Sequence, residues 1–248
     1  MRRKALLIGY SGWDIRNEKP LDGISVDLQR YKEFLMSNHG GAWEEYEIEI
    51  ILDEGLSNLG YILENIKKEQ NDIVFSVFTG HGDYDDDRCC RRLEVTKDKI
   101  ILECELLGLA PKQIFICDCC SRVVKKIITK KRILSESISI EEFTDLKQRA
   151  RKRYEKICQR CPDQTIRLYA SAKDCYANDT ENGGLYSYCL LNTLKNIAKT
   201  TNIVTAHNIA SELVEKQTME NPSYIFQKTG KIVPRLHSED LLPGAIIV

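Results

Sequence analysis

The sequence predicts an α/β protein: a three-layer sandwich in which helices cover both faces of a mainly parallel central sheet of about six strands. Its 248 residues, of which 42% are hydrophobic, are enough for one sizeable core. Short apolar runs that are typical of strands alternate along the chain with longer segments of helical periodicity. Alternation of this kind favours parallel strands joined by helices that pack on the sheet.

The chain begins with two strands and two helices. Residues 4–10 form a short apolar run closed by Ser-Gly, which predicts a buried first strand. Residues 22–39 place apolar side chains at near-helical spacing and end at Gly-Gly, which predicts a helix. Residues 46–52 alternate apolar and acidic side chains, as a strand does. Ser57 is the expected N-cap of a second helix, which runs through Lys68 with leucine and isoleucine along one stripe.

The same alternation continues through the rest of the chain. Residues 72–78 are almost continuously apolar, which is typical of a central parallel strand covered on both faces. A helix is expected across residues 100–107, followed by a fourth buried strand at 113–117. Another helix is expected across residues 140–158, before a fifth strand at 165–170. The remaining expected elements are helices at 187–199 and 206–216 and a last short strand at 223–227.

One domain, spanning residues 1–248, is predicted, because the sequence shows neither an internal repeat nor a linker between two cores. The least core-like segment is 125–164, which is rich in Lys, Arg, Glu and Ser. It divides the chain into a longer part, 1–124, and a shorter part, 165–248.

Charge and hydropathy exclude several classes of partner. The 36 basic residues nearly cancel the 37 acidic ones, so the formal charge of −1 gives no reason to expect nucleic acid as the main partner. No apolar run approaches the ~20 residues that cross a bilayer, so no membrane is expected either. The apolar stretch at residues 5–8 is too short for a secretory signal, and a cytoplasmic location is therefore expected.

Ten cysteines are many for a cytoplasmic chain. Without a signal peptide a disulfide framework is not expected. Cys158 and Cys161 have zinc-like C-x-x-C spacing, and this pair alone does not make a structural site. We therefore expect most thiols to fill core space, and we expect no metal and no cofactor.

Two reactive side chains follow neighbouring strands of the predicted sheet. Residues 79–83 (TGHGD), which contain His81, come directly after the third strand, and residues 118–122 (DCCSR) follow the fourth. Function in open α/β sheets gathers at the carboxyl ends of the strands, so an imidazole and a thiol are expected at one edge. This pairing is that of nucleophilic cysteine catalysis, with the amides of Gly82 and Cys120 as an oxyanion hole. Each residue taken singly is also compatible with a structural role.

Several motifs together resemble the clan of caspases, metacaspases and bacterial caspase-like proteases. The resemblance covers nearly the whole chain, and its histidine and cysteine motifs are the most specific. The matching segments are residues 4–10 (KALLIGY), 21–27 (LDGISVD), 78–82 (FTGHG), 118–121 (DCCS), 171–179 with 183–187, and 221–222.

The resemblance implies a role for each matching position. His81 corresponds to the general base and acid, and Cys120, in the third place of D-x-C, corresponds to the nucleophile. Cys119 is the alternative nucleophile, because the alignment of this motif leaves a shift by one residue open. The segments 1–124 and 165–248 correspond to the large and small subunits of caspases, and 125–164 corresponds to the linker between them.

Acidic residues predict the substrate preference. Asp118 lies two residues before the nucleophile, no arginine occurs between residues 171 and 185, and Asp179 is a further acidic contact. The resemblance adds Asp27 to the same pocket. A pocket of this charge repels an acidic side chain and pairs with a basic one, so cleavage after Arg or Lys is expected.

Basic clusters in segment 125–164 are candidate sites of autocleavage. The alternative is an amphipathic helix with a solvated basic face, and neither is favoured by the sequence. Docking to a membrane is disfavoured because acidic residues interrupt this face. The candidate residues are Lys130, Lys131, Arg132, Arg149, Arg151, Lys152 and Arg153.

The acidic run at residues 83–87 is compatible with calcium, and a solvated acidic loop is the favoured alternative. Nucleotide binding is not supported, since residues 9–12 match neither phosphate-binding glycine pattern. A cysteine phosphatase would need an arginine where Lys125 and Lys126 stand.

A protein substrate with Arg or Lys at the cleavage site is the expected partner. An activator protein or a second copy of the chain is a further possibility. The resemblance to bacterial members suggests that this substrate is an effector of antiviral defence. The other function left open is a catalytically silent scaffold, against which the presence of both His81 and Cys120 argues.

Overall fold

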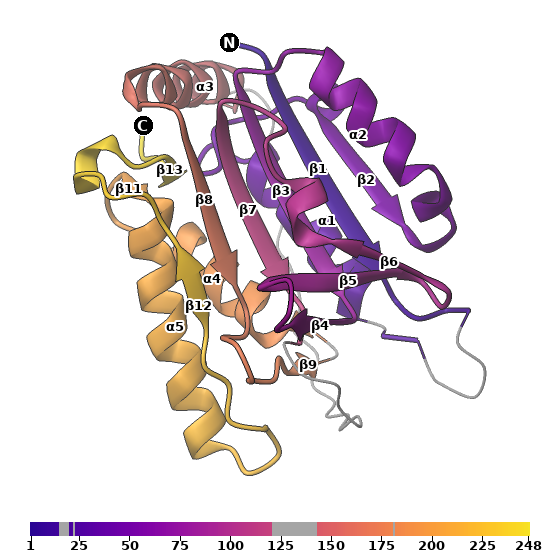
Figure 1. The fold of residues 1–248 in the computed structure, drawn as a ribbon. Helices are drawn as coiled ribbons and strands as arrows, with labels where there is room; N and C mark the ends of the chain where they lie inside the picture. The colour runs from indigo at the N-terminus through magenta and orange to yellow at the C-terminus, as the bar shows by residue number, and fades with distance from the viewer. Residues whose placement is uncertain (15–19, 22, 121–142, 181) are drawn as a thin grey trace.

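A six-stranded sheet forms the centre of the protein (Figure 1). The structure is a computed structural model that describes residues 1–14, 20–21, 23–120, 143–180 and 182–248. The strand order is β12-β8-β7-β3-β1-β2, and every neighbouring pair is parallel except β12 with β8. This confirms the predicted fold class. The strands are β1 (Arg3–Tyr10), β2 (Ile48–Leu52), β3 (Ile73–Gly80), β7 (Lys112–Asp118), β8 (Gln164–Tyr169) and β12 (Gly230–Ile232).

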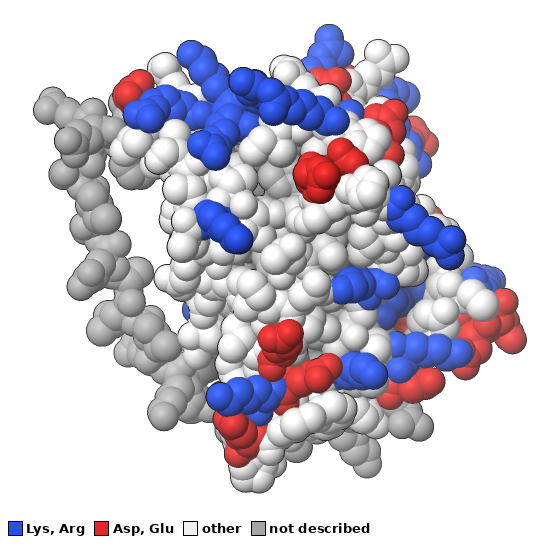
Figure 2. Space-filling view, turned by 90° about the vertical axis from the view of Figure 1, so that its left-hand side faces the viewer, with Lys and Arg blue, Asp and Glu red and all other residues white. Residues whose placement is uncertain are grey.

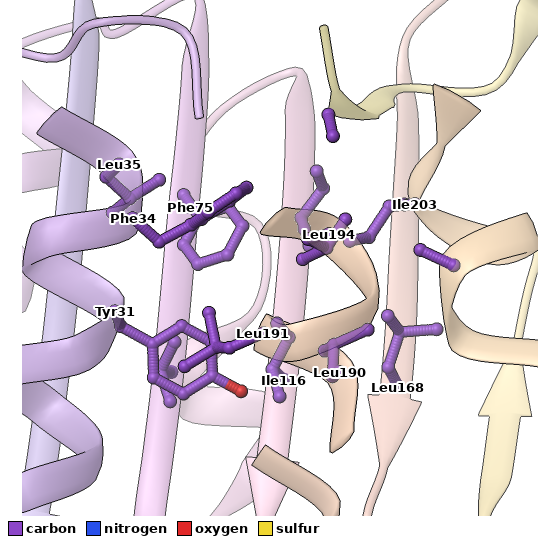
Figure 3. Packing of buried hydrophobic residues seen from close by; sticks show 14 of the residues in the cluster. Tyr31, Phe34, Leu35, Phe75, Ile116, Leu168, Leu190, Leu191, Leu194 and Ile203 are labelled. Carbon is purple, nitrogen blue, oxygen red and sulfur yellow. The ribbon is translucent and has the colours of Figure 1, made fainter. Parts of the chain in front are cut away.

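Four helices share a hydrophobic core with one face of the sheet. Along β1, Ala5 and Leu7 join this core, whereas Leu6 and Ile8 face the opposite layer, as the two-residue period of a strand requires. Figure 3 shows α1 and α4 packing onto strand residues such as Ile116. The four helices are α1 (Gly23–Met36), α3 (Phe143–Arg160), α4 (Leu185–Lys195) and α5 (Ile203–Glu220).

The opposite face of the sheet packs against α2 (Leu59–Lys68) and a small antiparallel sheet. The strands of this small sheet are β4 (Gly82–Asp85), β5 (Cys90–Thr96) and β6 (Lys99–Leu102). The predicted helix over residues 100–107 was therefore wrong for its first residues, which belong to β6, and only a 3-10 turn at Glu103–Leu106 lies within the rest of that range. Ile100 is exposed and Ile101 is buried, an alternation that suits the pairing of β6 with β5. A segment this short takes its conformation from its partner strand rather than from local propensity.

The predicted last strand at residues 223–227 was also wrong, because this segment is irregular. Its Ile225 gives its backbone N–H to Asn178 Oδ1 and accepts a bond from Asn178 Nδ2, so a side chain takes the place of a neighbouring strand. The antiparallel edge strand is β12 instead. Ser57 does not cap α2: it lies in a 3-10 turn, where its hydroxyl bonds to the carbonyl of Glu54.

Short elements complete the fold. They are β9 (Asp179–Thr180), β10 (Gly183–Gly184), β11 (Thr201–Asn202) and β13 (Pro243–Ala245), with 3-10 turns at Glu45–Glu47, Asp53–Asn58, Glu103–Leu106 and Ser238–Asp240. No helix within the described residues is both long and apolar enough to cross a membrane.

A buried ion cluster fixes α3 to the sheet. Arg3, whose side chain is fully buried, bonds to Glu47 at 2.8 Å, and its guanidinium lies 4.7 Å from the Trp43 ring centroid. Arg151 of α3 reaches the other oxygen of Glu47 at 2.7 Å. One carboxylate thus joins β1 to α3, which confines the helix to its place on the sheet.

Candidate active site

The register of the sheet brings His81 and Cys120 to the same edge. β3 and β7 are parallel neighbours, and their last paired residues are Thr79 and Asp118. His81 and Cys120 each lie two positions beyond that pair, so the loops that follow β3 and β7 leave the sheet side by side. Both side chains line one cavity of about 110 Å³, along with Ala177 and other residues. The structure thus brings the two predicted residues together.

The two adjacent cysteines have different surroundings. Cys119 is 2% exposed, and its Sγ lies 3.3 Å from Cys117 Sγ in the core. Cys120 is partly exposed, and its Sγ accepts a bond from the backbone N–H of Ala177 at 3.4 Å. Burial raises the pKa of the Cys120 thiol to about 11, although the Ala177 N–H favours the thiolate. At neutral pH this sulfur is a thiol, so a base is needed to activate it.

Close approaches of backbone hold the histidine loop. Gly80 has φ +149°, and a Cβ there would lie 2.6 Å from the carbonyl oxygen of Tyr10. A Cβ on Gly82 would lie 3.0 Å from Cys119 Sγ, so the two loops touch at that point. The Tyr10 ring meets the His81 ring edge-on at 6.1 Å. Gly82 itself is not among the described residues that line the cavity.

Three carboxyl groups gather beside the cavity. Asp27 is fully buried, and its Oδ2 accepts the Gly184 N–H at 2.8 Å. Its Oδ1 has no hydrogen-bond partner among the described residues. Asp118, which is 5% exposed, accepts bonds from the backbone and hydroxyl of Ser187. Asp179 lines the cavity with Asp118, whereas Asp27 lies behind the lining residue Gly184.

The electrostatics of these carboxyls reflect burial and mutual repulsion. Burial raises the pKa of Asp27 well above its usual range, and the negative charges of Asp118 and Asp179 raise it further. Burial likewise raises the pKa of Asp118, while the two bonds from Ser187 oppose the rise. A cation that entered the cavity would therefore stabilise the ionised carboxylates.

Sequence reasoning did not find the residues that support this site. The family resemblance included the segment with Gly184 and Ser187, but it did not indicate that Gly184 bonds to Asp27 or that Ser187 bonds to Asp118. Neither Gly183 nor Gly184 leaves room for a side chain, because a Cβ on Gly183 would overlap Asp27 Oδ1 and one on Gly184 would overlap Asp118 Oδ2. No local sequence pattern indicates a contact between residues as far apart in the chain as Asp27 and Gly184.

The candidate autocleavage residues lie in two places. Lys130, Lys131 and Arg132 are outside the described residues. Arg149, Arg151, Lys152 and Arg153 lie within α3, where Ala150 and Tyr154 are buried, as the amphipathic-helix alternative expects. Lys and Arg side chains gather along the top of the face shown in Figure 2, where α3 lies. Arg151 is bound to Glu47 as described above.

The two groups considered as metal ligands in the sequence, the acidic run 83–87 and the pair Cys158 and Cys161, have other surroundings. Asp83 bonds to Arg92, Asp85 to Arg88 and Asp86 to Lys173, so three acidic residues of the 83–87 run face cations of the protein itself. Cys158 and Cys161 are buried in the larger core cluster. Within the described residues no group of three or more His, Cys, Asp or Glu side chains could hold a metal ion.

Comparison with known proteins gives the family. A similar solved structure is caspase-1 from Spodoptera frugiperda, with a TM-score of 0.61 and 13% identity, covering 94% of this chain and 86% of that one. A protein from Geobacter sulfurreducens gives a TM-score of 0.60 at 13% identity, covering 98% of this chain and 97% of its own. At this identity the structures show the fold alone. No curated protein matches the sequence. The sequence model of the caspase domain matches residues 2–243. The chain therefore belongs to the caspase domain family of peptidases.

Proposed function

We propose that this protein is a cysteine endopeptidase in which His81 and Cys120 form the catalytic dyad. The observation that carries the proposal is that both side chains line one cavity at the carboxyl edge of the sheet. The raised pKa of Cys120 makes a neighbouring base necessary, and an imidazole titrates near neutral pH.

The reaction follows from these groups. As Cys120 Sγ attacks the scissile carbonyl carbon, its proton passes to His81, and the carbonyl oxygen becomes an oxyanion. The N–H groups of Gly82 and Cys120 stabilise this oxyanion. The C–N bond then breaks, His81 protonates the leaving amine, and a thioester remains on the sulfur. Water, deprotonated by His81, hydrolyses the thioester and restores the thiol.

The proposed specificity is for Arg or Lys at P1, the residue on the amino side of the cut. Asp118 and Asp179 line the cavity, and Asp27 bonds to the lining residue Gly184. Among the described residues the buried Oδ1 of Asp27 has no hydrogen-bond partner. A guanidinium or ammonium offers both charge and N–H donors to such a site. An acidic P1 side chain would be repelled.

Autoprocessing is proposed within residues 125–164, at Lys130, Lys131 or Arg132, between the parts 1–124 and 165–248. A peptidase acts on extended backbone, so the α3 residues would have to unwind first, and Arg151 would also have to leave Glu47. The resemblance to bacterial caspase-like proteases supports a cytoplasmic protein substrate, an effector of antiviral defence, with an activator protein or a second copy as partner.

The test is hydrolysis of three otherwise identical peptides with Arg, Lys or Asp at P1. Wild type is expected to cleave the Arg and Lys peptides after the basic residue and to leave the Asp peptide intact. Cys120→Ala should abolish cleavage. Preference for Asp would refute the proposed specificity, and cleavage of none of the peptides would favour a catalytically silent scaffold.

A further inference from the structure

We propose that Ser171 is a positioning residue that aims the Cys120 N–H, and that Arg91 holds Ser171 in place. The inference rests on the proposed function, because it concerns the oxyanion hole of that reaction. Neither residue lines the cavity.

The first step is the contact of Ser171 with the peptide group that carries the N–H. Ser171 is fully buried, and its hydroxyl donates to the carbonyl oxygen of Cys119 at 2.8 Å. That carbonyl and the Cys120 N–H belong to one planar trans peptide, so they point in opposite directions. A bond that fixes the carbonyl therefore fixes the direction of the N–H.

The second step is the anchoring of Ser171. Its own carbonyl oxygen accepts a bond from Arg91 Nη2 at 2.6 Å, and Arg91 is only 5% exposed. The guanidinium lies 3.6 Å from the centroid of the Tyr169 ring and 3.7 Å from Glu103 Oε2. The cation–π contact together with the attraction to the carboxylate leaves the guanidinium little freedom.

The third step is the rigidity of Glu103 itself. Glu103 is 4% exposed, and its Oε1 accepts bonds from Arg167 Nη1 at 3.2 Å and from the Tyr169 hydroxyl at 3.1 Å. Arg91 therefore reaches Ser171 from a carboxylate that two other side chains hold. Buried charges with several partners keep one geometry, since leaving it would uncover an unpaired charge.

The same small sheet also supports the histidine. β4 begins at Gly82, directly after His81, and Glu94 of β5 donates its N–H to the His81 carbonyl at 3.1 Å. β5 also carries Arg91. One strand thus contacts the histidine loop through its backbone, and through the Arg91 side chain it contacts Ser171, which in turn bonds to the cysteine loop.

The experiment compares Ser171→Ala with Ser76→Ala. Ser76 is a matched control: it is also fully buried, and its hydroxyl donates to a carbonyl of β7, that of Ile114, away from the cavity. For the P1-Arg peptide, Ser171→Ala is expected to lower kcat about tenfold or more with KM little changed, since loss of an oxyanion donor costs roughly 10²–10³ and misdirection costs less. Ser76→Ala should leave kcat unchanged.

A second readout separates aiming from general support. Alkylation of Cys120 by iodoacetamide forms no oxyanion, so its rate should be the same in wild type and Ser171→Ala. An equal loss of alkylation and turnover would overturn the inference, because Ser171 would then merely support the site. Unchanged kcat in Ser171→Ala would also overturn it while leaving the proposed function intact. A wild type that cleaves no peptide would refute both.

Arg91→Met provides the test if Ser171→Ala does not fold. It removes the donor to Ser171 and leaves the serine hydroxyl in place, so kcat should fall by a smaller factor. Arg92→Met is the control, because the neighbouring arginine on β5 pairs with Asp83 instead. Equal kcat in these two variants would contradict the role of Arg91.

Discussion

Replacing Asp27 by asparagine tests the proposed specificity pocket. In the wild type, Asp27 Oδ2 accepts a hydrogen bond from the Gly184 N–H at 2.8 Å. Asparagine has nearly the same shape and keeps an oxygen that can accept this bond. The change therefore removes charge and little else. Because Asp27 is fully buried, water would screen its charge poorly, and in the proposed pocket this charge would act strongly on a P1 cation.

The expected loss in catalysis is large. Removing one partner of a buried charge pair costs about 3–5 kcal/mol, and 3 kcal/mol is about a hundredfold in kcat/KM. The P1-Arg peptide should lose this factor in Asp27→Asn, whereas the P1-Asp peptide should stay uncleaved, as with wild type. Asp163→Asn is the control, since Asp163 is exposed and pairs with Lys112 instead.

Stability is expected to change in the opposite direction. The pKa of Asp27 is raised in the folded protein, so the protonated carboxyl favours the folded state. This contribution to stability is fully present below the pKa of the unfolded state and is lost as the pH rises through the pKa of the folded state. Asparagine cannot ionise, so in thermal melts the Tm of Asp27→Asn should rise relative to that of wild type as the pH is raised from 4 to 7.5. Cleavage of the P1-Arg peptide by Asp27→Asn at the wild-type rate would refute the assignment of Asp27 to this pocket.

Three further predictions concern the nucleophile and the core. Cys120→Ala should abolish turnover while Cys119→Ala retains it, and the reverse result in the peptide assay would move the nucleophile by one position. The rate of Cys120 alkylation by iodoacetamide should rise with pH towards about 11, and a plateau below pH 8 would show a preformed thiolate instead. Glu47→Gln should lower the free energy of unfolding by about 3 kcal/mol, and so the Tm by roughly 6–12 °C, because it leaves the buried Arg3 without its main partner. The exposed Glu45→Gln should change the Tm little, and equal Tm values for these two glutamate variants would contradict that role of the cluster.

Local patterns were sufficient to predict the five parallel strands of the main sheet and the helices. The apolar run of β3 and the helical spacing of α1 follow from burial, which acts on each residue in turn. β6 was missed because its conformation depends on β5. The irregular path near Ile225 was missed because Asn178 supplies its hydrogen bonds.

The two proposed catalytic residues could be placed from the sequence because each follows a recognisable buried strand. The acidic residues Asp27, Asp118 and Asp179 were also expected together, partly through family resemblance. Their supports could not be predicted: Arg91 and Ser171 are 80 positions apart, and no pattern in the chain relates them.

The most direct measurement of the central claim is the mass of the products from one peptide with a single internal arginine. Incubated with wild-type protein, it should yield two fragments divided on the carboxyl side of that arginine, and neither His81→Ala nor Cys120→Ala should release them. Fragments formed at the same rate by those variants, or a peptide left whole by the wild type, would contradict the claim that this imidazole and this thiol act on one scissile bond.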